Sequence, residues 1–306
     1  MAWFVLKRVL QAAFSVWVVV TLVFVLIHAS GDPIAVLAPE QMSAQDRAAL
    51  RQELGLDEPL IVQYGTYLAG IAKGDLGISY YSGQPAMRLI LDRVPVTLEL
   101  VALAVLIALI FGLPFGILSA IRPGTPADRL LRAVSTLGSS VPTFFVGILL
   151  IFAFSVELNV LPASGAGDLS HFIMPAFTLA FFRIALFTRL VRSSMLDTLS
   201  ENYVRTARAQ GMSEVTVIFK HALRTALLPL ITVFGLQFAQ LFAGAVITET
   251  IFAMPGMNRL ALTSLYRLDF PVVLSYIVVV AVMFSVVNLI VDLLYGVIDP
   301  RVSYGA

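Results

Sequence analysis

Apolar residues occur in long runs that are separated by polar segments. Crossing a bilayer takes about 20 consecutive helical residues, and six runs reach that length. They cover residues 9–29, 97–121, 133–156, 173–191, 226–250 and 272–296. This pattern predicts an all-α polytopic membrane protein with six transmembrane helices. The first run is longer than the apolar core of a secretory signal peptide, so we expect it to be a retained span.

Small residues and prolines add detail to these spans. Gly112 and Gly116 are four residues apart, a spacing that suits a close contact between two helices. Proline removes a backbone donor and can kink or break a helix, either to line a pathway or to fit a compact bundle. Four prolines lie inside the predicted spans: Pro114, Pro142, Pro175 and Pro229.

Lysine and arginine are distributed unevenly among the segments that connect the predicted spans. They are frequent before the first span, in 122–132 and in 189–225, whereas 157–172 has none. The long segment 30–96 holds five basic residues against eight acidic ones. Basic residues mark the cytoplasmic loops of membrane proteins. We therefore expect both termini in the cytoplasm and residues 30–96 outside.

The segment 30–96 carries helix signals of its own. Ser43 to Asp46 has the spacing of a capping box, in which side chains satisfy the free amides of a first helical turn. The helix that follows is expected to stop at Gly55. A second helix is expected after Pro59, and to end at Gly74. Between the first two spans we therefore predict an extracytoplasmic helical segment.

Composition agrees with a membrane protein. Hydrophobic residues make up 59% of the 306 residues and charged residues only 13%, with a mean hydropathy of +0.92. A soluble domain has roughly a quarter charged residues, so lipid must be the solvent for much of this surface. The chain has no cysteine, which excludes disulfides and thiolate catalysis.

The motifs of the main enzyme classes are missing or isolated. Only three lysines are present and none follows a glycine, so the phosphate-binding loop of ATPases is absent. The string Gly165-Ala-Gly-Asp168 matches intramembrane aspartyl proteases, but such enzymes need two facing carboxylates. Asp168 lies in a polar loop and is expected to be a solvated turn residue. We therefore predict a transport protein without enzymatic activity or a resident cofactor.

The segment between spans four and five is the most informative. It predicts two short amphipathic helices, broken at Gly211, on the cytoplasmic side. Ala207 and Ala209 are expected to give a small surface that another protein can approach closely. Basic residues are expected to rim this surface: Arg205, Arg208, Lys220 and Arg224. A helix lying on anionic lipid would have a similar pattern.

This segment resembles the ATPase-coupling loop of ATP-binding-cassette importer permeases. The resemblance lies in Tyr203-Val-Arg-Thr-Ala-Arg-Ala-Gln-Gly211, followed by His221-Ala-Leu-Arg224. It is greatest to the first-permease branch of the dipeptide, oligopeptide, glutathione and nickel permeases. The family's general Glu-Ala-Ala-x-x-x-Gly pattern has Arg205 and Thr206 in place of glutamate and the first alanine.

Further motifs in the same order extend the resemblance to nearly the whole chain. The outer segment contributes Gly31-Asp-Pro33, Leu54-Gly-Leu-Asp57 and Gly74-Asp-Leu-Gly77. The C-terminal third contributes Phe252-Ala-Met-Pro-Gly256, Asn288-Leu-Ile-Val-Asp292 and Asp299-Pro-Arg301. Asn258 stands where the family usually has glycine. Asparagine tolerates a left-handed backbone, so we expect the turn there to be kept.

The resemblance implies a transport subunit with several partners. A second, related permease would complete the pathway, and two ATPase subunits would bind ATP and Mg²⁺ and dock on the coupling helices. An extracytoplasmic binding protein would deliver peptides or similar small solutes. The stand-alone alternative is a secondary carrier or channel. The implied coupling residues are Tyr203, Arg205, Thr206, Ala207, Arg208, Ala209, Gly211, His221 and Arg224.

The expected organisation follows from these points. Residues 1–29 form the cytoplasmic N-terminus and first span, and 30–96 the extracytoplasmic segment. Residues 97–298 form a five-helix permease core with the coupling helices at 193–225, and 299–306 form a cytoplasmic tail. The protein is expected in the bacterial inner membrane. The substrate, among dipeptides, longer peptides, glutathione, opines, sugars and nickel chelates, stays open.

One charge falls well inside a predicted span. Arg183 lies about ten residues into span four, where an unpaired cation costs several kcal/mol. It is expected either to face a water-filled pathway, or to pair with Glu249 or an acid of a partner subunit, or to lie near the membrane surface. A guanidinium in the pathway would suit a carboxylate, such as the C-terminus of a peptide.

Overall fold

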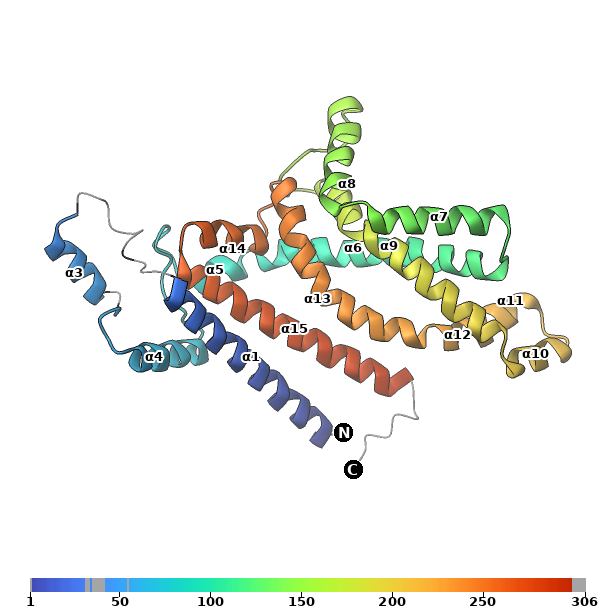
Figure 1. Cartoon of the computed structure of the whole chain (residues 1–306), viewed down its shortest axis with the longest axis horizontal. Coiled ribbons are helices and arrows are strands. Elements are labelled where there is room, and N and C mark those ends of the chain that lie inside the picture. The colour runs from blue at the N-terminus through green and yellow to red at the C-terminus, as the bar shows by residue number, and fades with distance from the viewer. Residues whose placement is uncertain (1, 31–33, 35–41, 54, 299–306) are drawn as a thin grey trace. The chain divides into compact units, whose positions relative to one another are not determined.

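The computed structural model describes residues 2–30, 34, 42–53 and 55–298. Within these residues the regular structure is helical, apart from one isolated antiparallel bridge between Ile78 and Pro85 (Figure 1). The chain divides into two compact units. One contains the residues up to Pro95 together with Gly256–Val286, and the other contains Val96–Pro255 and the residues from Val287 onwards. The predicted tail 299–306 and the motifs at 31–33 and Leu54 lie outside the described residues.

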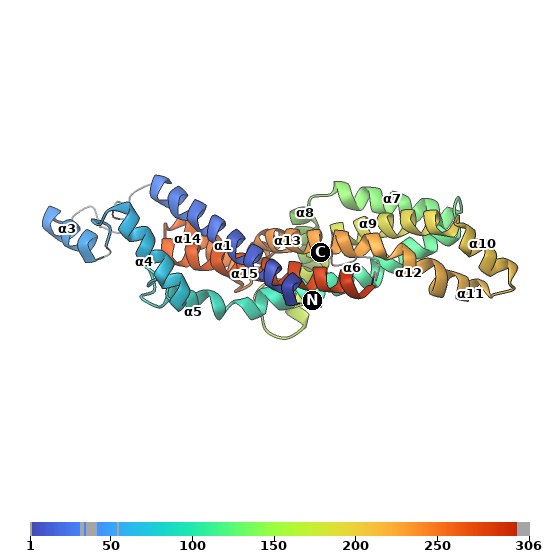
Figure 2. The ribbon, with the colours of Figure 1, turned by 90° about the horizontal axis from the view of Figure 1, so that it is seen from below.

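The first unit is built on two long antiparallel helices. Helices α1 and α15 lie side by side (Figures 1 and 2), and Val20 and Val278 share a small core with Leu76. The aromatic ring of Phe24 on α1 packs against Tyr64 and Tyr67. The helices of this unit are α1 (Ala2–Ser30), α3 (Ala44–Glu53), α4 (Leu60–Lys73), α5 (Ala86–Leu91), α14 (Met257–Tyr266) and, up to Val286, α15 (Phe270–Ile298).

The local helix signals of the segment 30–96 are confirmed where the structure describes them. The Ser43 hydroxyl accepts a hydrogen bond from the Asp46 amide at 3.1 Å and so caps α3. Helix α4 begins after Pro59 and ends at Gly74, whose φ of +73° is left-handed. Asn258 differs from expectation. It lies within α14 rather than in a left-handed turn, and its Oδ1 accepts a hydrogen bond from the Tyr276 hydroxyl at 2.8 Å.

The second unit packs long helices around α9. Gly112 and Gly116 allow the close contact that their spacing predicted, because an added Cβ would lie 2.8 Å from Phe187 Cβ and 2.6 Å from Val191 Cβ. Helix α7 packs beside α9 (Figure 2). The main helices here are α6 (Val94–Ile121), α7 (Pro126–Ser140), α8 (Thr143–Leu150), the π-helix η1 (Ile151–Glu157), α9 (Ser170–Leu199) and α13 (Leu228–Ile251).

The third predicted span is not one straight helix, which corrects the expectation for 133–156. Helices α7 and α8 meet at an angle of 102°. Val141 is extended, with φ −81° and ψ 126°, because the residue before a proline avoids the helical region. Pro142 is extended as well, and α8 begins at the next residue, Thr143. By contrast, α6 and α9 continue through Pro114 and Pro175.

Several helices are apolar enough for a bilayer. By length and composition, three helices in the described residues could cross a membrane, or four if α7 and α8 form one bent span. Shorter apolar stretches lie in α1 at Val9–Val25 and in α13 at Gln240–Ile251. The six predicted apolar runs lie largely in helical backbone, with breaks at residues 141–142 and at Leu227. The fold is an all-helical membrane protein with several apolar spans.

Candidate functional site

The predicted coupling segment is a helical hairpin. Helix α10 (Asn202–Ala209) ends before Gly211, whose φ of +79° reverses the chain. A second helical stretch follows, made of α11 (Glu214–Thr216), the π-helix η2 (Val217–Ala222) and α12 (Leu223–Ala226). The predicted break at Gly211 is confirmed. A residue with a side chain disfavours this backbone region, so glycine suits the turn.

The two arms of the hairpin share a small apolar core. Val204 and Val217 are completely buried, and Ala207 is 5% exposed between them, with Leu199 packed alongside. The expectation that Ala207 forms an accessible surface is therefore wrong. Its methyl group faces inward because it lies three residues after Val204, on the same side of α10. Ala209 is exposed, as expected.

Polar contacts also join the arms. Arg208 Nε donates to Glu214 Oε1 at 2.8 Å across the Gly211 turn, and the Tyr203 hydroxyl donates to Thr225 Oγ1 at 3.1 Å. Arg208 is thus engaged within the hairpin rather than standing free on its rim. Both members of this ion pair are well exposed, so it stabilises the hairpin by at most about 1 kcal/mol.

The outer surface of the hairpin is basic and apolar together. Arg205, Thr206, Lys220 and Arg224 are exposed, and His221 is partly exposed. Three exposed apolar side chains, one just before the second helical stretch and two within it, were not predicted from the sequence. They have the spacing i, i+3 and i+7, which could have revealed them: Met212 (38% exposed), Val215 (67%) and Phe219 (56%).

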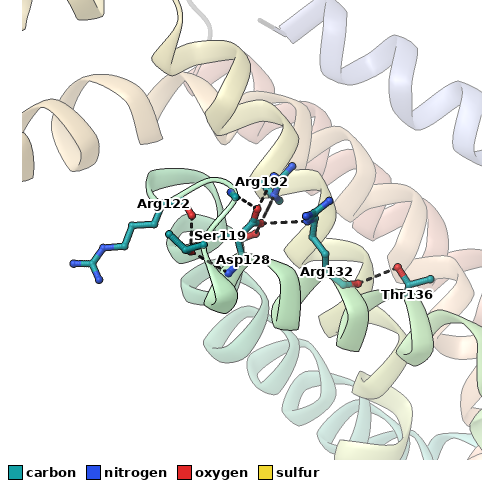
Figure 3. A network of polar contacts seen from close by, with 8 residues as sticks. Ser119, Arg122, Asp128, Arg132, Thr136 and Arg192 are labelled. Atoms are coloured by element: carbon teal, nitrogen blue, oxygen red, sulfur yellow. Dashed lines mark hydrogen bonds and ion pairs between the residues drawn. The ribbon is translucent and has the colours of Figure 1, made fainter.

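A buried ionic network holds α9 near its C-terminal end (Figure 3). This network was not predicted from the sequence. Asp128 is 1% exposed and accepts hydrogen bonds from Arg192 Nε at 2.9 Å and Nη2 at 3.2 Å. The Ser119 hydroxyl and the Gly124 amide also donate to this carboxylate. Arg132 Nε lies 3.5 Å from Asp128 Oδ1.

This network joins the α6–α7 turn to α9, seven residues before α9 ends. The side chain of Thr125 caps α7 by accepting a hydrogen bond from the Asp128 amide at 3.3 Å. The pattern Thr-Pro-Ala-Asp at 125–128 predicts this cap, but it does not identify Arg192, which is 64 residues away. Arg189 adds a second link, donating to the Ser135 carbonyl at 2.7 Å.

Arg183 lies inside the second unit. Its side chain is 6% exposed, and Nη1 donates to the Leu179 carbonyl at 3.1 Å. Nε is buried without a hydrogen-bond partner among the described residues. Within that part of the chain, no ion pair joins Arg183 to Glu249. Glu249 is itself buried and accepts a hydrogen bond from the Thr97 hydroxyl at 2.7 Å.

The polar loop before α9 behaves as a solvated turn. Asp168 is exposed, and hydrogen bonds from Ser170 and His171 lower the pKa of its carboxyl. It is therefore ionised at neutral pH. In the described residues no group of three or more histidine or acidic side chains has the arrangement of a metal site.

Comparison with known proteins agrees with these features. Residues 112–304 match the family of binding-protein-dependent transport system inner membrane components, and residues 1–101 match the N-terminal part of such components. The glutathione transport system permease protein GsiC of Escherichia coli K12 is 40% identical over 302 residues, covering 98% of this chain and 99% of GsiC. The oligopeptide transport system permease protein AppB of Bacillus subtilis is 39% identical over 316 residues, covering 99% and 100%.

Solved structures share the fold. An inward-facing structure of the MetNI methionine ABC transporter has a chain that matches with a TM-score of 0.60 at 18% identity, over 70% of this chain and 97% of that one. A chain of an amino acid ABC transporter matches with a TM-score of 0.54 at 18% identity, over 68% of this chain and 93% of that one. The chain therefore belongs to the binding-protein-dependent inner-membrane transport components, as the multi-pass permease subunit of an ATP-binding-cassette importer that works with ATPase and binding-protein partners.

Proposed function

We propose that this chain and a second, related permease together form a translocation pathway for peptides or similar small solutes. The relatives named for glutathione and oligopeptide transport support this substrate class. Each permease would cross the membrane six times with both termini in the cytoplasm, and residues 30–96 would lie outside. ATP and Mg²⁺ would be bound by the ATPase partners and not by this chain.

The Asn202–Ala226 hairpin is the proposed ATPase docking site. The observation that carries this is a self-packed hairpin whose outer surface presents basic side chains beside Met212, Val215 and Phe219. Exposed apolar groups next to cations favour a partner with an apolar groove and an acidic rim. When ATP closes the ATPase pair, it would move this hairpin and the corresponding one of the partner permease. This movement would rock the two helix bundles between inward-open and outward-open states.

Gly211→Pro tests the docking proposal. Proline cannot adopt a φ of +79°, and it removes the amide that donates to the Arg208 carbonyl at 3.0 Å. We expect the variant to reach the membrane but to lose co-purifying ATPase and substrate-stimulated ATP hydrolysis. Both would be measured on the purified importer with its binding protein.

Gly83→Pro is a matched control in the outer segment. Gly83 also has a positive φ, of +66°, and its amide donates to the Ser79 carbonyl at 3.0 Å. We expect this control to keep its ATPase subunits. If Gly211→Pro retained ATPase binding and stimulated hydrolysis like the control, the hairpin would not be the docking site.

A further inference from the structure

A membrane-embedded cation on α9 lacks the partners that its burial requires. Arg183 is 6% exposed, yet within the described residues its guanidinium has one hydrogen-bond acceptor, the Leu179 carbonyl, while Nε has none. The ring of Phe182 lies 5.9 Å from Cζ. A buried charge costs several kcal/mol unless it is paired or reached by water. The site is therefore short of a hydrogen-bond acceptor, and an anion fits it best.

Helix α13 packs closely against α9 at the same place, since a Cβ added at Gly244 would lie only 3.1 Å from Leu179 Cδ1. Gly244 faces the guanidinium, and a Cβ added there would lie 3.7 Å from both Nη1 and Nη2. Gln237 lies seven residues earlier on α13, two helical turns along the same face. Its Oε1 is buried and has no hydrogen-bond partner among the described residues. Two unsatisfied polar groups thus lie along the seam between α9 and α13, one a donor and the other an acceptor.

We propose that this seam is a binding site for a peptide-like solute in transit, in which Arg183 binds a carboxylate and Gln237 accepts an N–H. The planar guanidinium matches a carboxylate with two parallel hydrogen bonds. The rise between Gly244 and Gln237 is about 10 Å along α13, which is the length of about three residues of extended peptide. This inference rests on the proposed peptide substrate, and it assigns the recognition of that substrate within the membrane.

The site is closed in this structure. Because the guanidinium is covered by α9 and α13, a solute reaches it only when these helices separate. An under-paired buried cation also raises the free energy of the closed state relative to a state that admits water or a carboxylate. Arg183 therefore favours opening, and a bound carboxylate stabilises the opened state.

Substrate charge provides the first test. The complete importer in proteoliposomes is given a tripeptide with a free C-terminal carboxylate and the same tripeptide as its C-terminal amide. Arg183→Gln should lower the ratio of acid to amide import at least about tenfold, because hydrogen bonds between charged groups are lost. Arg88→Gln, at an exposed arginine paired with Asp92 at 3.9 Å, should leave that ratio unchanged. An unchanged ratio for Arg183→Gln, or equal losses for both peptides, would overturn the inference.

Water access provides a second test that does not depend on the substrate. The chain has no cysteine, so Arg183→Cys introduces a single reactive thiol. We expect a cationic, membrane-impermeant methanethiosulfonate to label it during ATP turnover and not in the resting importer. Absence of labelling in every nucleotide state would overturn the inference even if peptides are imported. A wild-type importer that takes up neither tripeptide would instead refute the peptide substrate, and labelling alone would then decide whether Arg183 faces the pathway.

Discussion

Replacing Asp128 with asparagine should destabilise the second unit strongly. The carboxylate is 1% exposed and accepts hydrogen bonds from Arg192, Ser119 and Gly124. Asparagine keeps a single acceptor oxygen and places an amide donor among these donors. The Arg192 guanidinium would then lose its counter-charge in a largely buried position.

The magnitude follows from burial. Breaking one partner of a buried ion pair costs about 3–5 kcal/mol. The side chain of Arg192 is 22% exposed, so water recovers part of that loss. We therefore expect Asp128→Asn to lower the free energy of unfolding by about 2–3 kcal/mol. For a chain of this size, that change corresponds to a fall in Tm of about 3–5 °C.

The assay is thermal unfolding of the purified permease in detergent, followed by size-exclusion fluorescence. Asp92→Asn is a suitable control, because Asp92 pairs with Arg88 at 3.9 Å and both side chains are mostly exposed. The control should change stability by less than about 0.5 kcal/mol. Combining Asp128→Asn with Arg192→Gln should cost less than the sum of the single changes. Equal Tm values for Asp128→Asn and Asp92→Asn would refute this account of the network.

Two further predictions concern packing and topology. Gly116→Ala should destabilise the protein by about 1–3 kcal/mol, because its Cβ would meet Val191 Cβ at 2.6 Å and the Thr188 carbonyl at 2.9 Å. Gly65→Ala on α4, with nothing within 4 Å, should be neutral or stabilising, and equal thermal stability of the two variants would contradict the packing argument. A cysteine introduced at Ser43 should react with an impermeant maleimide from the outer side of intact inner membranes; labelling only after permeabilisation would reverse the proposed orientation.

Much of the fold could be predicted because its signals are local. A run of apolar residues specifies a membrane helix wherever it lies, and the Ser43 cap and the left-handed Gly74 depend only on neighbouring residues. The same holds for the turn at Gly211. In each case the physical cause lies within about four residues of the effect.

What could not be predicted depends on direction or on distant partners. Hydropathy reports how apolar 133–156 is, but not that the chain turns by 102° inside it. The partnership of Asp128 with Arg192 joins residues 64 apart. Ala207 looked like a contact surface because a small residue is compatible with either side of a helix, and only its packing against Val217 decides that it faces inward.

The buried core of the Asn202–Ala226 hairpin determines how a mechanical load would travel through it. Glycine turns are usually compliant, and a hairpin joined only at Gly211 would bend there when its tip was pushed. Here the buried cluster of Val204, Ala207 and Val217 joins the two arms beside that turn, and packed interiors resist compression. A displacement applied to α10 is therefore expected to pass into η2 and α12 with little loss. In this arrangement the hairpin acts as a stiff lever arm rather than as a hinge.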